Sequence, residues 1–277
     1  MVKPFIELLR PINSIMAAIA VFVGAVVVAG TFAYYMTPVH LAIIVTFIIT
    51  GAGMTINDFF DMEIDFFNKR HRPLPSERVT PKGAFMFSMV LFAIGIYISY
   101  FINVYCFVLA FINSFLLVLY SFKLKKVLVL GHVFVSYLVA SSFVFGGFAV
   151  NLDNMVPVLV LSMIAFFSNI SREIIKTIED VRGDWHGRVK SLPITFGEKN
   201  ARKIASILLA VSIILAPLPY LWSYMTTIYM LALIPGLVLF TFSIIWNQRG
   251  VSAEKVHKLM KVAMLACLLA FLVGAVF

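Results

Sequence analysis

The chain has 277 residues, of which 62% are hydrophobic and only 13% are charged. This is more apolar surface than the core of one soluble domain can bury, so the composition excludes a soluble globular protein and predicts an integral membrane protein. The apolar runs show no alternation of period two, which excludes a membrane β-barrel.

Apolar stretches of about 20 residues, the length that crosses a hydrocarbon core of ~30 Å as a helix, recur along the whole chain. We therefore predict an all-α fold in a single domain over residues 1–277. The nine predicted membrane-spanning helices lie at about 12–33, 39–60, 83–101, 104–122, 128–148, 155–177, 202–221, 226–246 and 257–276.

The formal net charge of +9 is distributed unevenly along this pattern. The lysines and arginines fall at the amino terminus or in and next to the loops that follow the second, fourth, sixth and eighth spans. By the positive-inside rule, the amino terminus and these loops face the cytoplasm of a multi-pass cell-membrane protein. Topology and contact with membrane lipids account for about half or more of these basic residues but need not account for those next to acidic clusters, and we expect no nucleic-acid partner.

The first acidic cluster follows the second predicted span. Asn57, Asp61 and Asp65 are spaced i, i+4, i+8 and therefore line one face of a helix, with Asp58 beside them. Such a row of carboxylates and an amide is poorly tolerated next to hydrocarbon unless a cation neutralises it.

The second acidic cluster, with Asp180 and Asp184 also spaced i, i+4, follows the sixth predicted span. The two clusters recur four spans apart, which suggests pseudo-repeats at 1–125 and 126–246 with the ninth helix appended. Each cluster alone is also explained by a solvated acidic helix end that pairs with loop lysines.

Together the clusters favour a site for a hard divalent ion. Magnesium takes oxygen ligands and usually shares them with water and substrate phosphates. We therefore predict that one or two Mg²⁺ ions, and through them a diphosphate, are bound by Asn57, Asp61, Asp65, Asp180 and Asp184. The same residues are the candidate catalytic residues.

Basic residues near the clusters complete the predicted site, because cationic side chains usually help magnesium to neutralise a diphosphate leaving group. The candidates follow the first cluster, close the fourth span after Tyr120, or open the first span, where Asn13 lies one turn inside. They are Lys69, Arg70, Arg72, Lys125 and Arg10, with Asn13, Asp58 and Tyr120 as further substrate-binding candidates.

Glu173 and Lys176 lie near the end of the sixth span with i, i+3 spacing. They either form an intrahelical ion pair or help to bind an acceptor substrate.

At these residues the chain resembles the UbiA superfamily of intramembrane prenyltransferases, whose signature is an NDxxDxxxD motif after the second helix and a DxxxD motif after the sixth. Asn57, Asp58, Asp61 and Asp65 match the first motif, and Asp180 and Asp184 match the second. Supporting matches are Arg72-Pro73-Leu74-Pro75, Tyr120-Ser121 before Leu124-Lys125, and Ser191-Leu192-Pro193 before Phe196-Gly197. Where the family often has YxxxK, this chain has Leu124, with lysines on either side.

The resemblance implies a bundle around a central cavity that is open to lipid, with magnesium and diphosphate at its cytoplasmic mouth. It also implies transfer of an isoprenyl chain from an allylic diphosphate donor to an acceptor nucleophile.

Within the superfamily, the opening around Arg10 and the Arg172–Lys176 run are most similar to the archaeal enzymes that form the second ether bond of membrane lipids. This similarity implies transfer of a geranylgeranyl chain from geranylgeranyl diphosphate to a phosphorylated lipid acceptor, geranylgeranylglyceryl phosphate. One alternative is an aromatic acceptor, 4-hydroxybenzoate or a naphthoate, as in quinone biosynthesis. A more remote alternative is an ion-coupled transporter, although such proteins usually place their sites at mid-membrane.

Overall fold

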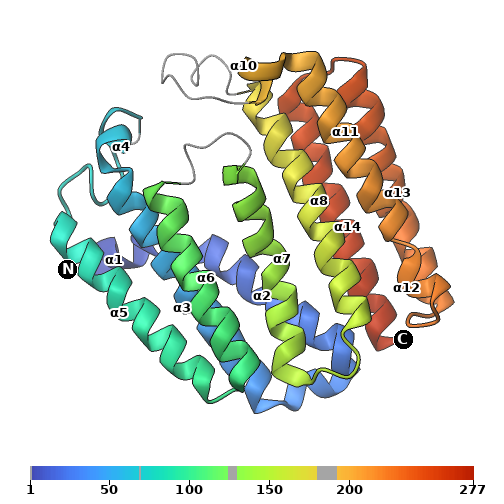
Figure 1. Cartoon of the computed structure of the whole chain (residues 1–277), viewed down its shortest axis with the longest axis horizontal. Helices are drawn as coiled ribbons and strands as arrows, with labels where there is room; N and C mark the ends of the chain where they lie inside the picture. Colours follow the sequence, from blue (N-terminus) through green and yellow to red (C-terminus); the bar gives the residue numbers. More distant parts are fainter. Residues whose placement is uncertain (1, 69, 124–129, 180–191) are drawn as a thin grey trace.

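The computed structural model describes residues 2–68, 70–123, 130–179 and 192–277. Over these residues the chain forms helices joined by short connections, with no strand among them (Figure 1). The elements are α1 (Val2–Leu8), α2 (Pro11–Ala29), η1 (Gly30–Tyr35), α3 (Thr37–Phe60), α4 (Met62–Asn68), α5 (Pro81–Tyr100), α6 (Val104–Phe122), α7 (Leu130–Val150), α8 (Val156–Glu179), α10 (Leu192–Phe196), α11 (Glu198–Leu215), α12 (Leu218–Leu221), α13 (Thr227–Gln248) and α14 (Ala253–Val276).

In the described part of the chain, nine helical segments are long and apolar enough to cross a membrane. They cover 11–35, 37–60, 81–100, 104–122, 130–150, 156–179, 198–221, 227–248 and 253–276. The all-α prediction and the predicted number and order of spans are confirmed. The predicted and observed helix boundaries differ most at the starts of α11 (residue 198) and α14 (residue 253), where a charged first turn extends the helix beyond the apolar stretch.

Helix starts follow local signals in the sequence. The Thr80 side chain caps α5 by accepting a hydrogen bond from the Gly83 backbone N–H (3.1 Å), and Pro81 occupies the first turn. Asn103 caps α6 in the same way through Cys106 N–H (2.9 Å). Its amide also donates to the Phe148 carbonyl oxygen (2.7 Å), so this cap joins α6 to the end of α7.

Successive spans run in opposite directions, which brings the functional segments to one end of the bundle. This end, called the basic face below, holds the starts of α2, α5, α7, α11 and α14 and the ends of α3, α6, α8 and α13. The short helices α4 and α10 also lie there (Figure 1).

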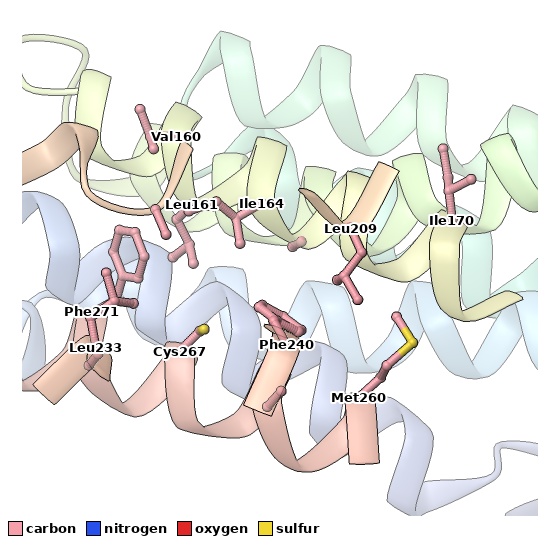
Figure 2. Close-up of a cluster of buried hydrophobic side chains, with 14 of the residues drawn as sticks. Val160, Leu161, Ile164, Ile170, Leu209, Leu233, Phe240, Met260, Cys267 and Phe271 are labelled. Atoms are coloured by element: carbon pink, nitrogen blue, oxygen red, sulfur yellow. The ribbon is translucent and has the colours of Figure 1, made fainter. Parts of the chain in front are cut away.

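Two hydrophobic cores hold the bundle together. One lies mainly among α8, α11, α13 and α14, where Ile164, Leu209, Phe240, Met260 and Phe271 gather (Figure 2). The other lies among α2, α3, α5, α6 and α7. The predicted pseudo-repeats stay a prediction.

Helices α2 and α7 approach each other closely because glycine lies on both sides of their contact. A Cβ atom at Gly24 would lie 2.0 Å from the Phe143 carbonyl oxygen, and one at Gly146 would lie 1.8 Å from the Val21 carbonyl oxygen. Small residues at a contact allow such backbone packing in membrane proteins. Serine adds bonds between other spans, as in Ser88 Oγ to the Ala52 carbonyl oxygen (2.9 Å).

Candidate functional site

The first acidic cluster lies at the junction of α3 and α4. Asp61 ends α3, yet its N–H donates to the Asn57 carbonyl oxygen (3.0 Å), and the Asp65 N–H donates to the Asp61 carbonyl oxygen (2.8 Å). The i to i−4 pattern therefore continues across the junction and keeps these three residues on one side, as predicted from their spacing. The Asn57 amide also donates to Asp61 Oδ2 (2.9 Å).

Asp58 and Asp65 are buried and are paired with arginines from two other segments. Their side chains are 4% and 5% exposed. Arg72 donates from Nη1 to Asp58 Oδ1 (3.0 Å) and to Asp65 Oδ2, and Arg10, which precedes α2, also pairs with Asp58. We call Arg10, Arg72, Asp58 and Asp65 the arginine clamp. It neutralises carboxylates that would otherwise be costly at the end of a membrane span.

Arg10 occupies a special position in the backbone. It joins α1 to α2 and has φ 45° and ψ 67°, in the left-handed region that few residues other than glycine adopt. This conformation turns the chain between the two helices, so the guanidinium reaches Asp58 on α3. Such backbone positions cost of order 1 kcal/mol and are concentrated at functional sites.

The segment that carries Arg72 is held in place by Arg78. The Arg78 guanidinium donates to the His71 carbonyl oxygen (2.7 Å) and to Ser76 Oγ (3.0 Å). It also pairs with Glu7 of α1 (2.8 Å) and so lowers the pKa of the Glu7 carboxyl. A small hydrophobic core of Leu8, Leu74, Val79 and Ala84 also packs α1 against residues 71–79 and α5.

We expect Arg78→Gln to lower kcat about 10-fold and to raise the KM for a diphosphate substrate, because Arg72 would lose its rigid support. Glu7→Gln is the matched control, since it removes only an exposed ion pair, which contributes little to stability. Steady-state kinetics and thermal unfolding of both variants and of Arg78→Lys test this positioning role. Unchanged kinetics in Arg78→Gln would contradict it.

Polar residues of α6 and α8 lie near the first acidic cluster. Tyr120, near the end of α6, lies within electrostatic reach of both Asp61 on α3 and Glu173 on α8. Glu173 pairs with its neighbour Arg172 (2.6 Å), and Arg172 also donates to Asn169 Oδ1 (3.0 Å). Within the described residues, the partner of Glu173 is thus Arg172 rather than Lys176, which is exposed.

The structure brings together some of the predicted site residues and not others. Arg10, Asp58, Arg72 and Asp65 meet in the clamp. Asn13 is exposed, one turn from Arg10. Arg70 is exposed, and its Nε donates to the Phe66 carbonyl oxygen of α4 (3.1 Å). Four predicted site residues lie outside the described residues: Lys69, Lys125, Asp180 and Asp184.

Sequence reasoning did not select Arg78, Arg172 or His257 as site residues. Arg78 is one of several basic residues in its loop, and only its contacts across the fold distinguish it. Arg172 is a charged residue within an apolar helix, and the acidic residue Glu173 next to it is the feature of the sequence that could have indicated its role. His257 lies on the last helix, far from either acidic motif in sequence.

The donor atoms of the first cluster suit magnesium. Asn57, Asp61 and Asp65 offer only oxygen ligands from one side of one helical segment, as a hard divalent ion requires. No group of three His, Cys, Asp or Glu side chains converges in the described ranges, the first cluster included, since one of its three residues is an asparagine.

The fold and these groups define a multi-pass all-α membrane protein with an acidic and arginine-rich site at one end of the bundle. The chain belongs to the UbiA prenyltransferase family, whose pattern matches residues 17–272. It is therefore a prenyltransferase.

The chain is similar along its whole length to curated enzymes of archaea. It is 41% identical to digeranylgeranylglyceryl phosphate synthase of Methanopyrus kandleri, over 98% of each chain. It is 37% identical to the synthase of the same name from Methanococcus maripaludis strain S2, over 100% of this chain and 99% of the relative.

The fold is similar to solved structures of the same kind. A structure described as digeranylgeranylglyceryl phosphate synthase superposes with a TM-score of 0.90 at 36% identity, and the match covers 99% of this chain and 98% of the other. A UbiA homologue from Archaeoglobus fulgidus, bound to DMAPP and Mg²⁺, superposes with a TM-score of 0.72 at 17% identity over 96% of this chain and 97% of that one. At this identity the second likeness concerns the fold alone.

Proposed function

We propose that the protein transfers a geranylgeranyl group from geranylgeranyl diphosphate to geranylgeranylglyceryl phosphate and so forms a second ether bond. The observation that carries this proposal is the oxygen-ligand face of Asn57, Asp61 and Asp65 with the arginine clamp beside it, opposite Tyr120 and Glu173. The full-length similarity to synthases of this name supports the choice of substrates.

Magnesium is the cofactor that we propose, with Asn57, Asp61, Asp65, Asp180 and Asp184 as its ligands. When bound, it neutralises the diphosphate of the donor and stabilises it as a leaving group. Arg10 and Arg72 pair with Asp58 and Asp65 and orient these carboxylates at the α3–α4 junction, next to the place where this charge develops.

The chemical step exchanges one carbon–oxygen bond for another. The bond between the allylic carbon and the diphosphate breaks, and the electron pair leaves with the diphosphate. The glycerol hydroxyl of the acceptor attacks the allylic carbon and forms the ether bond, and its proton ends on the released diphosphate. The apolar walls of the bundle exclude water, which would otherwise capture the allylic cation.

We infer that the basic face is cytoplasmic, because the lysines and arginines gather at this end of the spans. Both substrates carry phosphate groups, which do not cross a bilayer readily. In sealed inverted membrane vesicles the reaction should therefore proceed without detergent, and in sealed right-side-out vesicles it should require detergent.

The purified protein in detergent tests the proposed function directly. With Mg²⁺, geranylgeranyl diphosphate and geranylgeranylglyceryl phosphate, we expect release of diphosphate and formation of a lipid with two ether-linked chains, and we expect chelation of Mg²⁺ to stop both. If product forms only with 4-hydroxybenzoate or a naphthoate, the acceptor is aromatic and the proposed acceptor is wrong. Mass spectrometry of the lipid product distinguishes the two results.

A further inference from the structure

A second group of basic side chains lies where the ends of α8 and α14 meet at the basic face. Arg172 and Lys176 are one turn apart on α8, and His257 and Lys261 are one turn apart on α14. His257 Nδ1 lies 3.2 Å from Glu179 Oε2, which places the start of α14 next to the end of α8. Arg172, Lys176 and Lys261 all lie within electrostatic reach of His257.

The charges of this group are only partly balanced by the protein. Arg172 pairs with Glu173 (2.6 Å), and His257 lies beside Glu179. Lys176 and Lys261 form no ion pair with any of the described residues, whereas Lys258, on the same helix, pairs with Glu254. Among the described residues, the three permanent cations Arg172, Lys176 and Lys261 therefore face two carboxylates, which gives this part of the group an excess of positive charge.

Lys261 stands at a costly position for an unpaired charge. It lies about two turns inside α14, a helix apolar enough to span the membrane. Its long side chain can reach the membrane surface, as lysines near helix ends often do. An anion bound between α8 and α14 would also neutralise it, and would bring Lys176 and Arg172 into the same set of contacts.

This basic group is separate from the arginine clamp but connected to it. The clamp joins Arg10 before α2, the α3–α4 junction and Arg72, whereas this group lies on α8 and α14. Figure 1 shows α4 well away from the end of α8. Between the two lie Tyr120, which interacts with Asp61, and Glu173, which interacts with Tyr120 and pairs with Arg172. The site thus has two cationic ends, one on each side of Tyr120 and Glu173.

We propose that Arg172, Lys176, His257 and Lys261 bind the phosphate monoester of the lipid acceptor, a proposal that rests on the proposed function. Two substrates carry phosphate groups, and each needs cationic partners away from the other so that their charges do not repel. The clamp and the metal ligands serve the diphosphate of the donor. The α8–α14 group serves the phosphate of the acceptor and leaves its glycerol hydroxyl near Glu173.

The test compares Michaelis constants for the two substrates in the full-length protein. We expect Lys261→Gln and Lys176→Gln each to raise the KM for the phosphorylated acceptor at least about 10-fold, because each removes a charge-assisted contact. The KM for geranylgeranyl diphosphate and kcat at saturating acceptor should stay within about 2-fold, and Lys261→Arg should restore most of the loss. Lys258→Gln is the matched control, since it removes a lysine from the same helix that is already paired with Glu254.

A second arm separates the phosphate of the substrate from the headgroups of membrane lipids. In nanodiscs of zwitterionic lipid, glycerol 1-phosphate should compete with the acceptor in the wild type and much less in Lys261→Gln. If the group instead binds anionic membrane lipid, the variants will keep a normal acceptor KM and lose only a stimulation by anionic lipid, and the proposal fails. If the wild type makes no product from the phosphorylated acceptor, the proposed function fails first, and the two failures are distinct.

Discussion

Asp61→Ala is expected to lower turnover at least about 10³-fold while the protein stays folded in detergent. Asp61 lies at the α3–α4 junction, bonded to the Asn57 amide and near Tyr120, and it is one of the proposed magnesium ligands. Loss of one carboxylate from a site that neutralises a leaving diphosphate removes several kcal/mol of transition-state stabilisation. Release of diphosphate at saturating Mg²⁺ and donor measures the effect.

Asp153→Ala is the control for this experiment, because Asp153 is an exposed acid in the loop between α7 and α8, at the opposite end of the bundle from the basic face. It should keep wild-type turnover. Asp61→Asn retains an oxygen ligand without the charge and should recover only a small part of the activity. Turnover close to that of the wild type in Asp61→Ala would remove the first acidic cluster from the mechanism.

Arg72→Gln is expected to reduce both stability and activity, because Arg72 is shared by two buried carboxylates. Removal of one partner from a buried ion pair costs about 3 kcal/mol or more, since the remaining charge stays out of water. For a chain of this size we expect the midpoint of thermal unfolding in detergent to fall by roughly 5–10 °C. Turnover should fall as well, because Asp65 loses the guanidinium that orients it.

A double-mutant cycle separates the two effects of Arg72. Asp65→Asn in the Arg72→Gln background removes the carboxylate that has lost Arg72 and leaves the Arg10–Asp58 pair in place, so part of the lost stability should return while activity stays absent. Lys82→Gln, an exposed change at the start of α5, controls for the loss of any positive charge. If Arg72→Gln and Lys82→Gln unfold at the same temperature, the buried pairs do not contribute to stability.

The predicted spans were close to the structure because lipid imposes a simple rule on sequence. A backbone that crosses hydrocarbon must satisfy its own hydrogen bonds, so an apolar run of about 20 residues forms a helix. The boundaries differed most at Glu198 and Ala253, where a polar first turn continues the helix into water and carries no hydropathy signal. The i, i+4, i+8 row of Asn57, Asp61 and Asp65 was equally readable, since it depends only on helix geometry.

The partners of these residues could not be read in the same way. Many lysines and arginines lie near the basic face, and sequence alone ranked Arg70 with Arg72. The structure separates them: Arg72 enters the clamp, because Arg78 and the small core of Leu8 and Leu74 hold its segment in place. Arg70 instead donates to the Phe66 carbonyl oxygen of α4.

Sequence by itself thus predicted nine membrane-spanning helices, which the described residues confirm, and the row of Asn57, Asp61 and Asp65 along one side of the chain after the second of them. These properties follow from local composition and helical periodicity, which act over a few turns. Tertiary structure alone decided that Arg10 and Arg72 share Asp58, and that His257 of the last helix meets Glu179 of α8. These contacts join residues far apart in the chain, and they depend on how the spans pack rather than on any signal that one span contains.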